Sequence, residues 1–188
     1  MKRTPRLPAS ARRAQLIDVG RAVFAKHGYE ATSVEHIADR AKVSKPVVYE
    51  HFGGKEGLYA VVVDREMEAQ QALKEILSAQ GYGVVALTDP QRALDELRAN
   101  RFQLVILDVS PGTGGGDALA TIRGFDRDVC VIATSSVASV ELAVATMKYQ
   151  AFHYLQKPVE TEEVLAVVKE AIRERGLVVD LETRLNAE

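Results

Sequence analysis

The chain has 188 residues, 47% of them hydrophobic, and a net charge of −2. This size and apolar content suit one large core or two small ones and exclude a disordered chain. No run approaches the ~18 apolar residues of a membrane-spanning helix, and no signal-peptide pattern follows the basic start, so we expect a cytoplasmic protein without membrane contact. The single cysteine, Cys130, lies in an apolar run and is expected to be a buried core thiol.

The charge is divided unevenly along the chain. Residues 1–58 hold eleven Lys or Arg against six Asp or Glu, whereas the remaining residues hold thirteen against twenty. A basic segment attached to an acidic one is typical of a nucleic-acid-binding part joined to a part with another role.

Residues 1–10 are basic and rich in proline, and we predict a flexible arm there. Within residues 11–58, the apolar spacing and the cap residues predict three helices, which cover residues 11–27, 34–41 and 45–52. The last two are joined by a tight turn. This is the helix-turn-helix pattern, in which the second helix enters the major groove of DNA.

Polar side chains suited to DNA contacts cluster in this segment. From their chemistry, the candidates are Thr32, Ser33, Lys45, Tyr49 and His51. Lys45 offers a cation to phosphate or guanine, and the residues that precede the second helix direct its N-terminus toward phosphate. The alternative is a plain three-helix bundle in which Tyr49 is core and Lys45 is merely solvated.

The stretches GYEATSVEHIA and VSKPVVYEHFGGKEGLY resemble the DNA-binding domain of the tetracycline-repressor family over about residues 10–68. The resemblance implies DNA contacts at Ser44, Lys45, Tyr49, His51 and Lys55. It also implies that a fourth helix runs through residues 61–67. The helical ligand-binding half of that family does not follow.

Residues 55–80 allow two interpretations. The run Tyr59 to Val63 favours a buried strand, whereas the Glu, Met, Ala and Leu residues around it favour a helix. Because GGKEGLY runs directly into Val61 in the repressor pattern, we predict one connecting helix over residues 55–80.

The C-terminal part, residues 81–175, alternates strands with helices, which predicts an α/β parallel sheet covered on both faces. The predicted strands cover residues 83–87, 104–108, 129–133 and 152–155, and the predicted helices cover residues 90–97, 118–123, 140–148 and 161–174. Residues 176–188 form a tail that is either a short dimer helix or frayed. The fold class is therefore a two-part chain, an all-α helix-turn-helix bundle followed by an α/β domain.

Three polar side chains follow predicted strands at the carboxyl edge of the sheet, where ligands collect. Asp108 could take a phosphoryl group, Ser135 could bond its oxygens, and Lys157 could neutralise it. Their order in the chain predicts a phosphoacceptor pocket.

The segments LVILDVSPG, VIATSS and AFHYLQKPVETEEVLAVVKEAI resemble the receiver domain of two-component response regulators, a flavodoxin-like fold. The resemblance implies that Asp108 is the phosphoacceptor, with Ser135 and Lys157 in the phosphate pocket and Tyr154 as the switch aromatic. It also implies a cis bond before Pro158 and a sensor histidine kinase or small phosphodonor as partner.

Two departures from the receiver pattern concern the start of the domain. With residues 59–64 in a helix, the receiver lacks its first strand. Residues 84–87 must then pair directly with residues 104–107, or a strand must come from another chain. The resemblance implies Mg²⁺ held by Asp108 and Asp64, but Arg65 stands where a second acid belongs and is expected to weaken that site. Elsewhere, Gln150 replaces the glycine expected after the fourth receiver helix.

Together these patterns predict a transcriptional regulator, not an enzyme, that binds double-stranded DNA as a homodimer. Phosphorylation or partner docking at the receiver-like domain would modulate it. The alternatives are a receiver-like module that only dimerises or docks, a phosphotransfer hydrolase using Asp108 as nucleophile, and a constructed fusion without evolved coupling.

Overall fold

A computed structural model describes residues 7–110, 113–137 and 139–185, with side chains described as far as residue 176. It divides into two compact units between Gln71 and Ala72. In the described part of the chain, no helix combines the length and the apolar character that crossing a bilayer requires.

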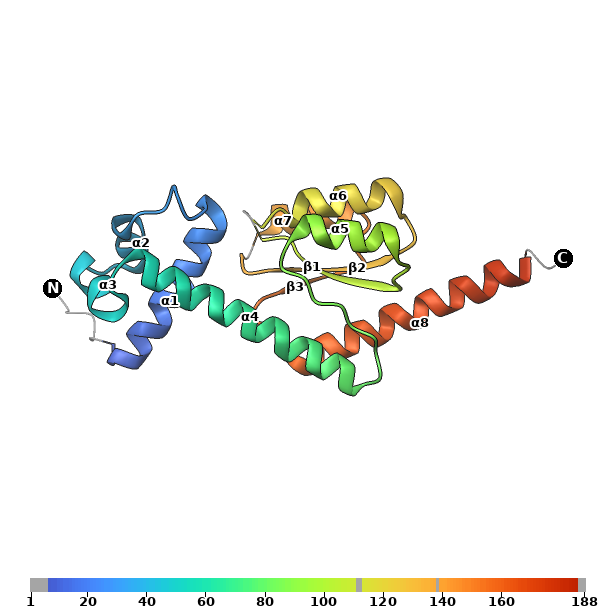
Figure 1. Cartoon of the computed structure of the whole chain (residues 1–188), viewed down its shortest axis with the longest axis horizontal. Helices are drawn as coiled ribbons and strands as arrows, with labels where there is room; N and C mark the ends of the chain where they lie inside the picture. Colours follow the sequence, from blue (N-terminus) through green and yellow to red (C-terminus); the bar gives the residue numbers. More distant parts are fainter. Residues whose placement is uncertain (1–6, 111–112, 138, 186–188) are drawn as a thin grey trace. The chain divides into compact units, whose positions relative to one another are not determined.

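The first unit is helical (Figure 1, blue to cyan). Its helices are α1 (Ala9–His27), α2 (Val34–Ala41), α3 (Lys45–Phe52) and the first part of α4 (Lys55–Ala79). All four helices contribute to one apolar core, and its fully enclosed side chains are Leu16, Ile37, Val48 and Leu58. The predicted helix-turn-helix is therefore held by a hydrophobic core that it shares with α1 and α4.

Local signals set the limits of α2 and α3. The hydroxyl of Ser33 accepts the backbone N–H of His36 at 3.1 Å and so caps α2. Lys42 takes a left-handed conformation, with φ 55°, in the turn between α2 and α3. Helix α3 begins after Ser44 with Pro46 in its first turn, where a missing N–H costs nothing.

Helix α4 contains residues 59–64, which confirms the helical interpretation of this stretch. Leu58 and Val62, one turn apart, are 0% and 6% exposed and belong to the core of the first unit. A valine in a helix costs a few tenths of a kcal/mol relative to alanine, at most about 0.7. Burying a Val or Leu side chain contributes about 1.5–3 kcal/mol, so packing overrides the strand propensity.

The second unit is an α/β domain whose three strands are all parallel, in the order β1-β2-β3. Besides the last turns of α4, its elements are α5 (Pro90–Ala99), β1 (Leu104–Asp108), α6 (Gly115–Phe125), β2 (Cys130–Ser135), α7 (Val140–Lys148), β3 (His153–Gln156) and α8 (Thr161–Leu185). The predicted elements agree with these to within a few residues, apart from the differences given below.

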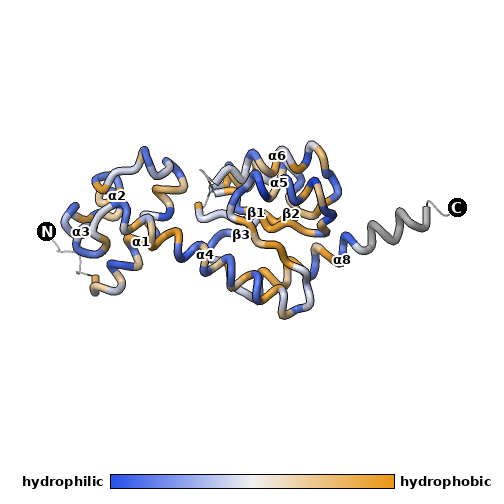
Figure 2. The backbone as a smooth tube through the Cα atoms, in the orientation of Figure 1, coloured by the Kyte–Doolittle hydropathy of each residue, from blue (hydrophilic) through white to orange (hydrophobic). Residues whose placement is uncertain are grey.

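Helices cover both faces of this sheet, as Figure 1 shows. On one face, Ile132 of β2 belongs to the same core as Leu77 of α4 and Val168 of α8. On the other, Val131 belongs to a core with Leu119 of α6 and with α5. The strands β1 and β2 are correspondingly hydrophobic in Figure 2. The two-sided burial explains why their sequences are continuous apolar runs.

The strand predicted at residues 83–87, and its pairing with residues 104–107, are wrong. Residues 82–87 form no regular element, and β1 forms its ladder with β2. Tyr82 and Val84 still pack against the core, while Val85 is 55% exposed. A strand requires a hydrogen-bonding neighbour as well as a suitable composition, and composition alone does not specify that neighbour.

Other differences are smaller. Helix α1 begins at Ala9, so the end of the predicted arm is helical, and residues 1–6 lie outside the described residues. Helix α8 continues to Leu185, so the backbone of the tail is helical to that point. Cys130 is half-buried rather than fully enclosed, and its burial raises the pKa of its thiol. The cis bond expected before Pro158 is present.

Candidate functional site

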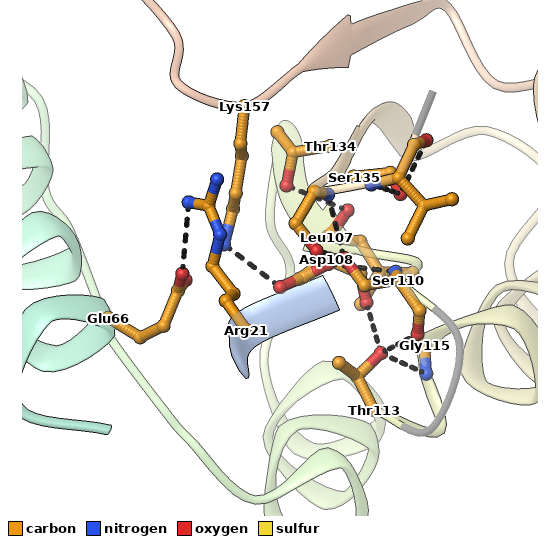
Figure 3. A network of polar contacts seen from close by, with 12 residues as sticks. Arg21, Glu66, Leu107, Asp108, Ser110, Thr113, Gly115, Thr134, Ser135 and Lys157 are labelled. Carbon is orange, nitrogen blue, oxygen red and sulfur yellow. Dashed lines mark hydrogen bonds and ion pairs between the residues drawn. The ribbon is translucent and has the colours of Figure 1, made fainter. Parts of the chain in front are cut away.

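Asp108 and Lys157 meet at the carboxyl edge of the sheet, as the strand order predicts. Asp108 is the last residue of β1, and Lys157 follows β3. The ammonium Nζ of Lys157 donates to Oδ2 of Asp108 at 2.9 Å, and the two side chains are 22% and 33% exposed (Figure 3). The pocket thus pairs one carboxylate with one ammonium and stays open to solvent on one side.

Ser110 holds the other oxygen of the carboxylate. Its backbone N–H and its hydroxyl both donate to Oδ1 of Asp108, at 2.8 and 2.5 Å. The Ser110 hydroxyl also accepts the backbone N–H of Ser136 at 2.9 Å and the Ser136 hydroxyl at 3.1 Å. Ser110 therefore links the loop after β1 to the loop after β2.

The turn after Asp108 is closed by Thr113 and Gly115. The Thr113 hydroxyl donates to the backbone carbonyls of Asp108 and Ser110, at 3.0 and 2.7 Å. A Cβ on Gly115 would lie 1.8 Å from the carbonyl oxygen of Asp108, so only glycine fits there. Helix α6 therefore begins directly against the backbone of Asp108.

Ser135 and Tyr154 converge on the backbone of Val137. Ser135 is fully enclosed, its hydroxyl accepts the N–H of Val137 at 3.1 Å, and it lies 3.4 Å from the carbonyl oxygen of that residue. The Tyr154 hydroxyl donates to the same carbonyl at 3.1 Å. The predicted pocket residue Ser135 and the predicted switch residue Tyr154 thus lie at the same carbonyl, while Asp108 is held by Ser110 and Lys157.

The donor set at Asp108 does not fit a divalent cation. Mg²⁺ takes octahedral geometry, keeps several waters as ligands, and is held in proteins by the negative charge of one or two carboxylates. At Asp108 one negative charge faces one positive charge, and both carboxylate oxygens already accept protein N–H or O–H groups. At an effective dielectric constant of about 20, an ammonium about 4 Å away repels a dication by about 8 kcal/mol, which cancels the attraction of a carboxylate at the same distance.

The rest of the described chain also lacks a cluster of metal ligands. Among the residues that the structure describes, no three His, Cys, Asp or Glu side chains come together. Asp64, the second predicted metal ligand, lies on the exposed side of α4 within the first unit. The described residues thus supply no group of three such side chains for the predicted Mg²⁺.

In the first unit, α3 presents polar side chains to solvent. Tyr49 is 54% exposed, so it is not part of the core, whereas Ile37 and Val48 are fully enclosed. Lys45 is exposed at the start of α3, and its Nζ lies 2.9 Å from the carboxylate of Glu35. Such an exposed ion pair contributes little to stability, which leaves Lys45 available for a stronger anion.

Two predicted DNA contacts are engaged within the protein. The Thr32 side chain is 2% exposed and its hydroxyl donates to the carbonyl of Gly28 at 2.7 Å. Nζ of Lys55 donates to the carbonyl of Tyr29 at 3.0 Å and lies 4.1 Å from the centre of the Tyr29 ring. Ser33 uses its hydroxyl as the cap of α2.

Sequence reasoning missed two positioning residues. Arg13 of α1 donates to the carbonyl of His51 at 2.6 Å and lies over the Phe52 ring at 4.4 Å, so it fixes the end of α3. No local signal identifies that role. Ser110, by contrast, stands two residues after the strand-end Asp108, which is the spacing at which an Asp carboxylate accepts a backbone N–H.

Comparison with known families agrees with the two units. The family "Response regulator receiver domain" matches residues 60–169, more than half of the chain. The chain belongs to the response regulator receiver family. Residues 16–62 match "Bacterial regulatory proteins, tetR family", which makes the first unit a TetR-type helix-turn-helix region.

Individual relatives divide in the same way. The transcriptional activator FasR of Mycolicibacterium smegmatis is 46% identical over 67 residues, which cover 36% of this chain and 31% of that protein. The regulatory protein FixJ of Bradyrhizobium diazoefficiens is 31% identical over 114 residues, covering 60% and 56%. PrrA of Mycobacterium tuberculosis is 32% identical over 117 residues, covering 62% and 50%. The matched part of this chain thus covers between about a third and somewhat more than half of the length of each of these relatives.

Solved receiver domains share the fold of the second unit. A response regulator from Thermotoga maritima is 28% identical with a TM-score of 0.52, covering 55% of this chain and 87% of that one. The signal receiver domain of a putative Luxo repressor from Vibrio parahaemolyticus, 24% identical with a TM-score of 0.58, covers 62% and 90% and supports the fold alone.

Proposed function

We propose that this receiver-family chain is a DNA-binding transcriptional regulator whose affinity for DNA is modulated at the Asp108 pocket. The observation that carries the proposal is the presence, in one chain, of a TetR-type helix-turn-helix region and a receiver unit with a carboxylate–ammonium pair at its strand ends. The proposal assigns the chain no enzymatic turnover and places it in the cytoplasm, where DNA and phosphodonors are present.

The proposed DNA contacts come from α3 and the starts of α2 and α4. Lys45 and Tyr49 are the exposed members of the predicted set on α3. Ser44 and His51 complete the face of α3 that would enter the major groove, and the start of α2 at Ser33 would face phosphate. Thr32 and Lys55 act through the packing of Gly28 and Tyr29. Two copies bound as a homodimer would cover two half-sites.

The proposed chemistry at Asp108 is the uptake of one phosphoryl group. A lone pair of the carboxylate attacks the phosphorus of a phosphohistidine or of acetyl phosphate, the bond from phosphorus to the leaving group breaks, and the leaving group departs with that electron pair. The product is an acyl phosphate on Asp108. The Lys157 ammonium is the group that would neutralise its added negative charge.

The signal would then pass through the shared acceptor at Val137. A phosphoryl group that attracts the Ser135 hydroxyl would remove one partner of that carbonyl, leaving the Tyr154 hydroxyl as the other. Bonding at Ser135 and Tyr154 would thus be coupled, which biases a two-state element of the kind that population-shift regulation requires.

A second candidate function has its own support. Because Ser110 and Lys157 occupy both oxygens of Asp108, the unit could act as a docking or dimerisation module that takes no phosphoryl group. In that case neither the wild type nor Asp108→Ala would change its DNA binding when a phosphodonor is added.

The DNA-binding half of the proposal is tested on DNA fragments that the full chain selects from a random pool. In a mobility-shift titration, Lys45→Ala is expected to weaken binding on all selected fragments and to reduce the slope of log K against log salt by about 1, because one phosphate contact is lost. Lys148→Ala, which removes an exposed lysine of α7 in the second unit, is the matched control and should change neither quantity. No selected fragment at all, with or without phosphodonor, would contradict the proposal.

A further inference from the structure

The carboxylate of Asp108 is paired with an ammonium before any ligand enters the pocket. Lys157 donates to Oδ2 at 2.9 Å, and the N–H and hydroxyl of Ser110 donate to Oδ1 at 2.8 and 2.5 Å. The ammonium cancels the charge of the carboxylate, and the Ser110 donors satisfy the remaining oxygen. A cation at this pocket would therefore meet no surplus of negative charge.

The proton of Ser110 is directed at Asp108 by the bonds on the other side of the hydroxyl. A hydroxyl has one proton and two acceptor lone pairs. The Ser110 oxygen accepts both the N–H and the hydroxyl of Ser136, and the Ser110 side chain is 3% exposed. Both lone pairs are thus occupied, which leaves the proton for Oδ1 of Asp108. Ser110 is a positioning residue that fixes the orientation of the carboxylate.

From this geometry we infer that the Asp108 pocket operates without a divalent cation, with Lys157 as its resident positive charge and Ser110 as the group that orients the carboxylate. The inference deepens the proposed function and rests on it only in one respect, that the ligand is a phosphoryl group. The anion that enters meets protein donors alone: the ammonium of Lys157 and the N–H and O–H groups of the two loops.

The covalent step needs no further reactant under this inference. A lone pair of an Asp108 oxygen forms a bond to the phosphorus of acetyl phosphate, the bond from phosphorus to the acetate oxygen breaks, and acetate leaves with the electron pair. The added charge lies beside Lys157, whose ammonium is already at the carboxylate. Chelation of divalent cations should therefore leave the reaction unchanged.

Cation binding is tested first on the full chain, because this test does not depend on phosphorylation. Mn²⁺ is titrated into the wild type, Asp108→Asn and Lys157→Met, and bound Mn²⁺ is measured by electron paramagnetic resonance. The wild type and Asp108→Asn should be indistinguishable below about 1 mM Mn²⁺, the range of weak protein sites. Lys157→Met, which leaves Asp108 without its ammonium, should bind Mn²⁺ at least about tenfold more tightly, a change of about 1.4 kcal/mol.

Saturable Mn²⁺ binding by the wild type that Asp108→Asn removes would overturn the inference. So would equal Mn²⁺ affinities of the wild type and Lys157→Met, because Lys157 would then not be the group that excludes the cation. Circular dichroism spectra of the variants check that each is folded. Lys157→Gln provides a second neutral variant if Lys157→Met does not fold.

Phosphoryl uptake is tested separately by intact-protein mass spectrometry after incubation with acetyl phosphate. The labelled fraction should be equal in Mg²⁺ and in a chelator, and it should disappear in Asp108→Asn. Labelling that appears only with Mg²⁺ would overturn the inference. No labelling under either condition would instead contradict the proposed phosphoacceptor, and the Mn²⁺ titration would still decide whether the pocket excludes cations.

Discussion

At the scale of single residues, the left-handed backbone conformation of Gln150 could be predicted, although a glutamine is unusual in that conformation. The sequence pattern predicts a glycine after the fourth receiver helix, and the glutamine found there has φ 56°, in the left-handed region. A side chain in that region is disfavoured by about 1–2 kcal/mol. The conformation persists because the carbonyl of Gln150 accepts the guanidinium of Arg123 at 3.0 Å.

Replacing Gln150 by glycine should therefore stabilise the second unit. We expect Gln150→Gly to raise the free energy of unfolding by about 0.5–1 kcal/mol, because the relief of strain exceeds the added entropy of the unfolded chain. Urea denaturation followed by circular dichroism measures this. Gln150→Ala keeps the Cβ and is the matched control; a gain as large in that variant would show that strain at this residue is not the cause.

Arg123 marks the limit of prediction at this scale. Arg123 of α6 donates to four backbone carbonyls, those of Asp126, Val129, Tyr149 and Gln150. That role depends on loops that meet only in the folded unit, so nothing near Arg123 in the sequence reveals it. Asp108 and Lys157, in contrast, could be predicted because parallel strands bring their carboxyl ends to one edge.

At the scale of elements, the first turn of α4 depends on a glycine. A Cβ on Gly57 would lie 1.9 Å from the carbonyl oxygen of Phe52, the last residue of α3. Helix α4 can begin directly after α3 only because residue 57 has no side chain to collide with this carbonyl oxygen. The sequence shows Gly57 inside a helical pattern, where a glycine usually costs stability, and gives no reason for it.

Gly57→Ala is thus expected to lower both the stability of the first unit and its affinity for DNA. Gly124→Ala is the matched control, because Gly124 lies within α6 with open space around its Cα. In the control, helix propensity should raise the free energy of unfolding by up to about 1 kcal/mol. Thermal melts and mobility shifts on both variants measure the difference; stabilisation by Gly57→Ala would contradict the close approach.

The predictions for residues 59–64 and 83–87 differ in outcome for one physical reason. Both stretches are short and rich in valine. Residues 59–64 lie where Leu58 and Val62 reach the core of the first unit, and that core fixes a helix. Residues 83–87 form no ladder within the described part of the chain, and residues 59–64, which would supply the receiver's first strand beside them, are helical. Local composition does not determine whether such a stretch forms a helix or a strand, and its packing partners in the folded chain do.

At the scale of the whole molecule, the two families share residues. The tetR family match ends at residue 62 and the receiver match begins at residue 60. The structure places residues 60–62 within α4, and the boundary between the two units also falls within that helix. The two-part organisation and the order of the families could be predicted from motifs. Composition alone left residues 59–64 open between helix and strand, and the resemblance of GGKEGLY to the repressor pattern was needed to predict the helix.

The central claim is that DNA affinity in the first unit responds to Asp108 in the second. The most direct measurement is the Kd for one selected DNA fragment, by fluorescence anisotropy, for the wild type and Asp108→Ala, each with and without acetyl phosphate. Allosteric coupling typically changes affinity by about 5- to 150-fold, so acetyl phosphate should change the wild-type Kd by at least about fivefold. It should leave the Kd of Asp108→Ala unchanged. Equal Kd values for the wild type with and without acetyl phosphate, on a sample shown by mass spectrometry to be labelled, would contradict the claim.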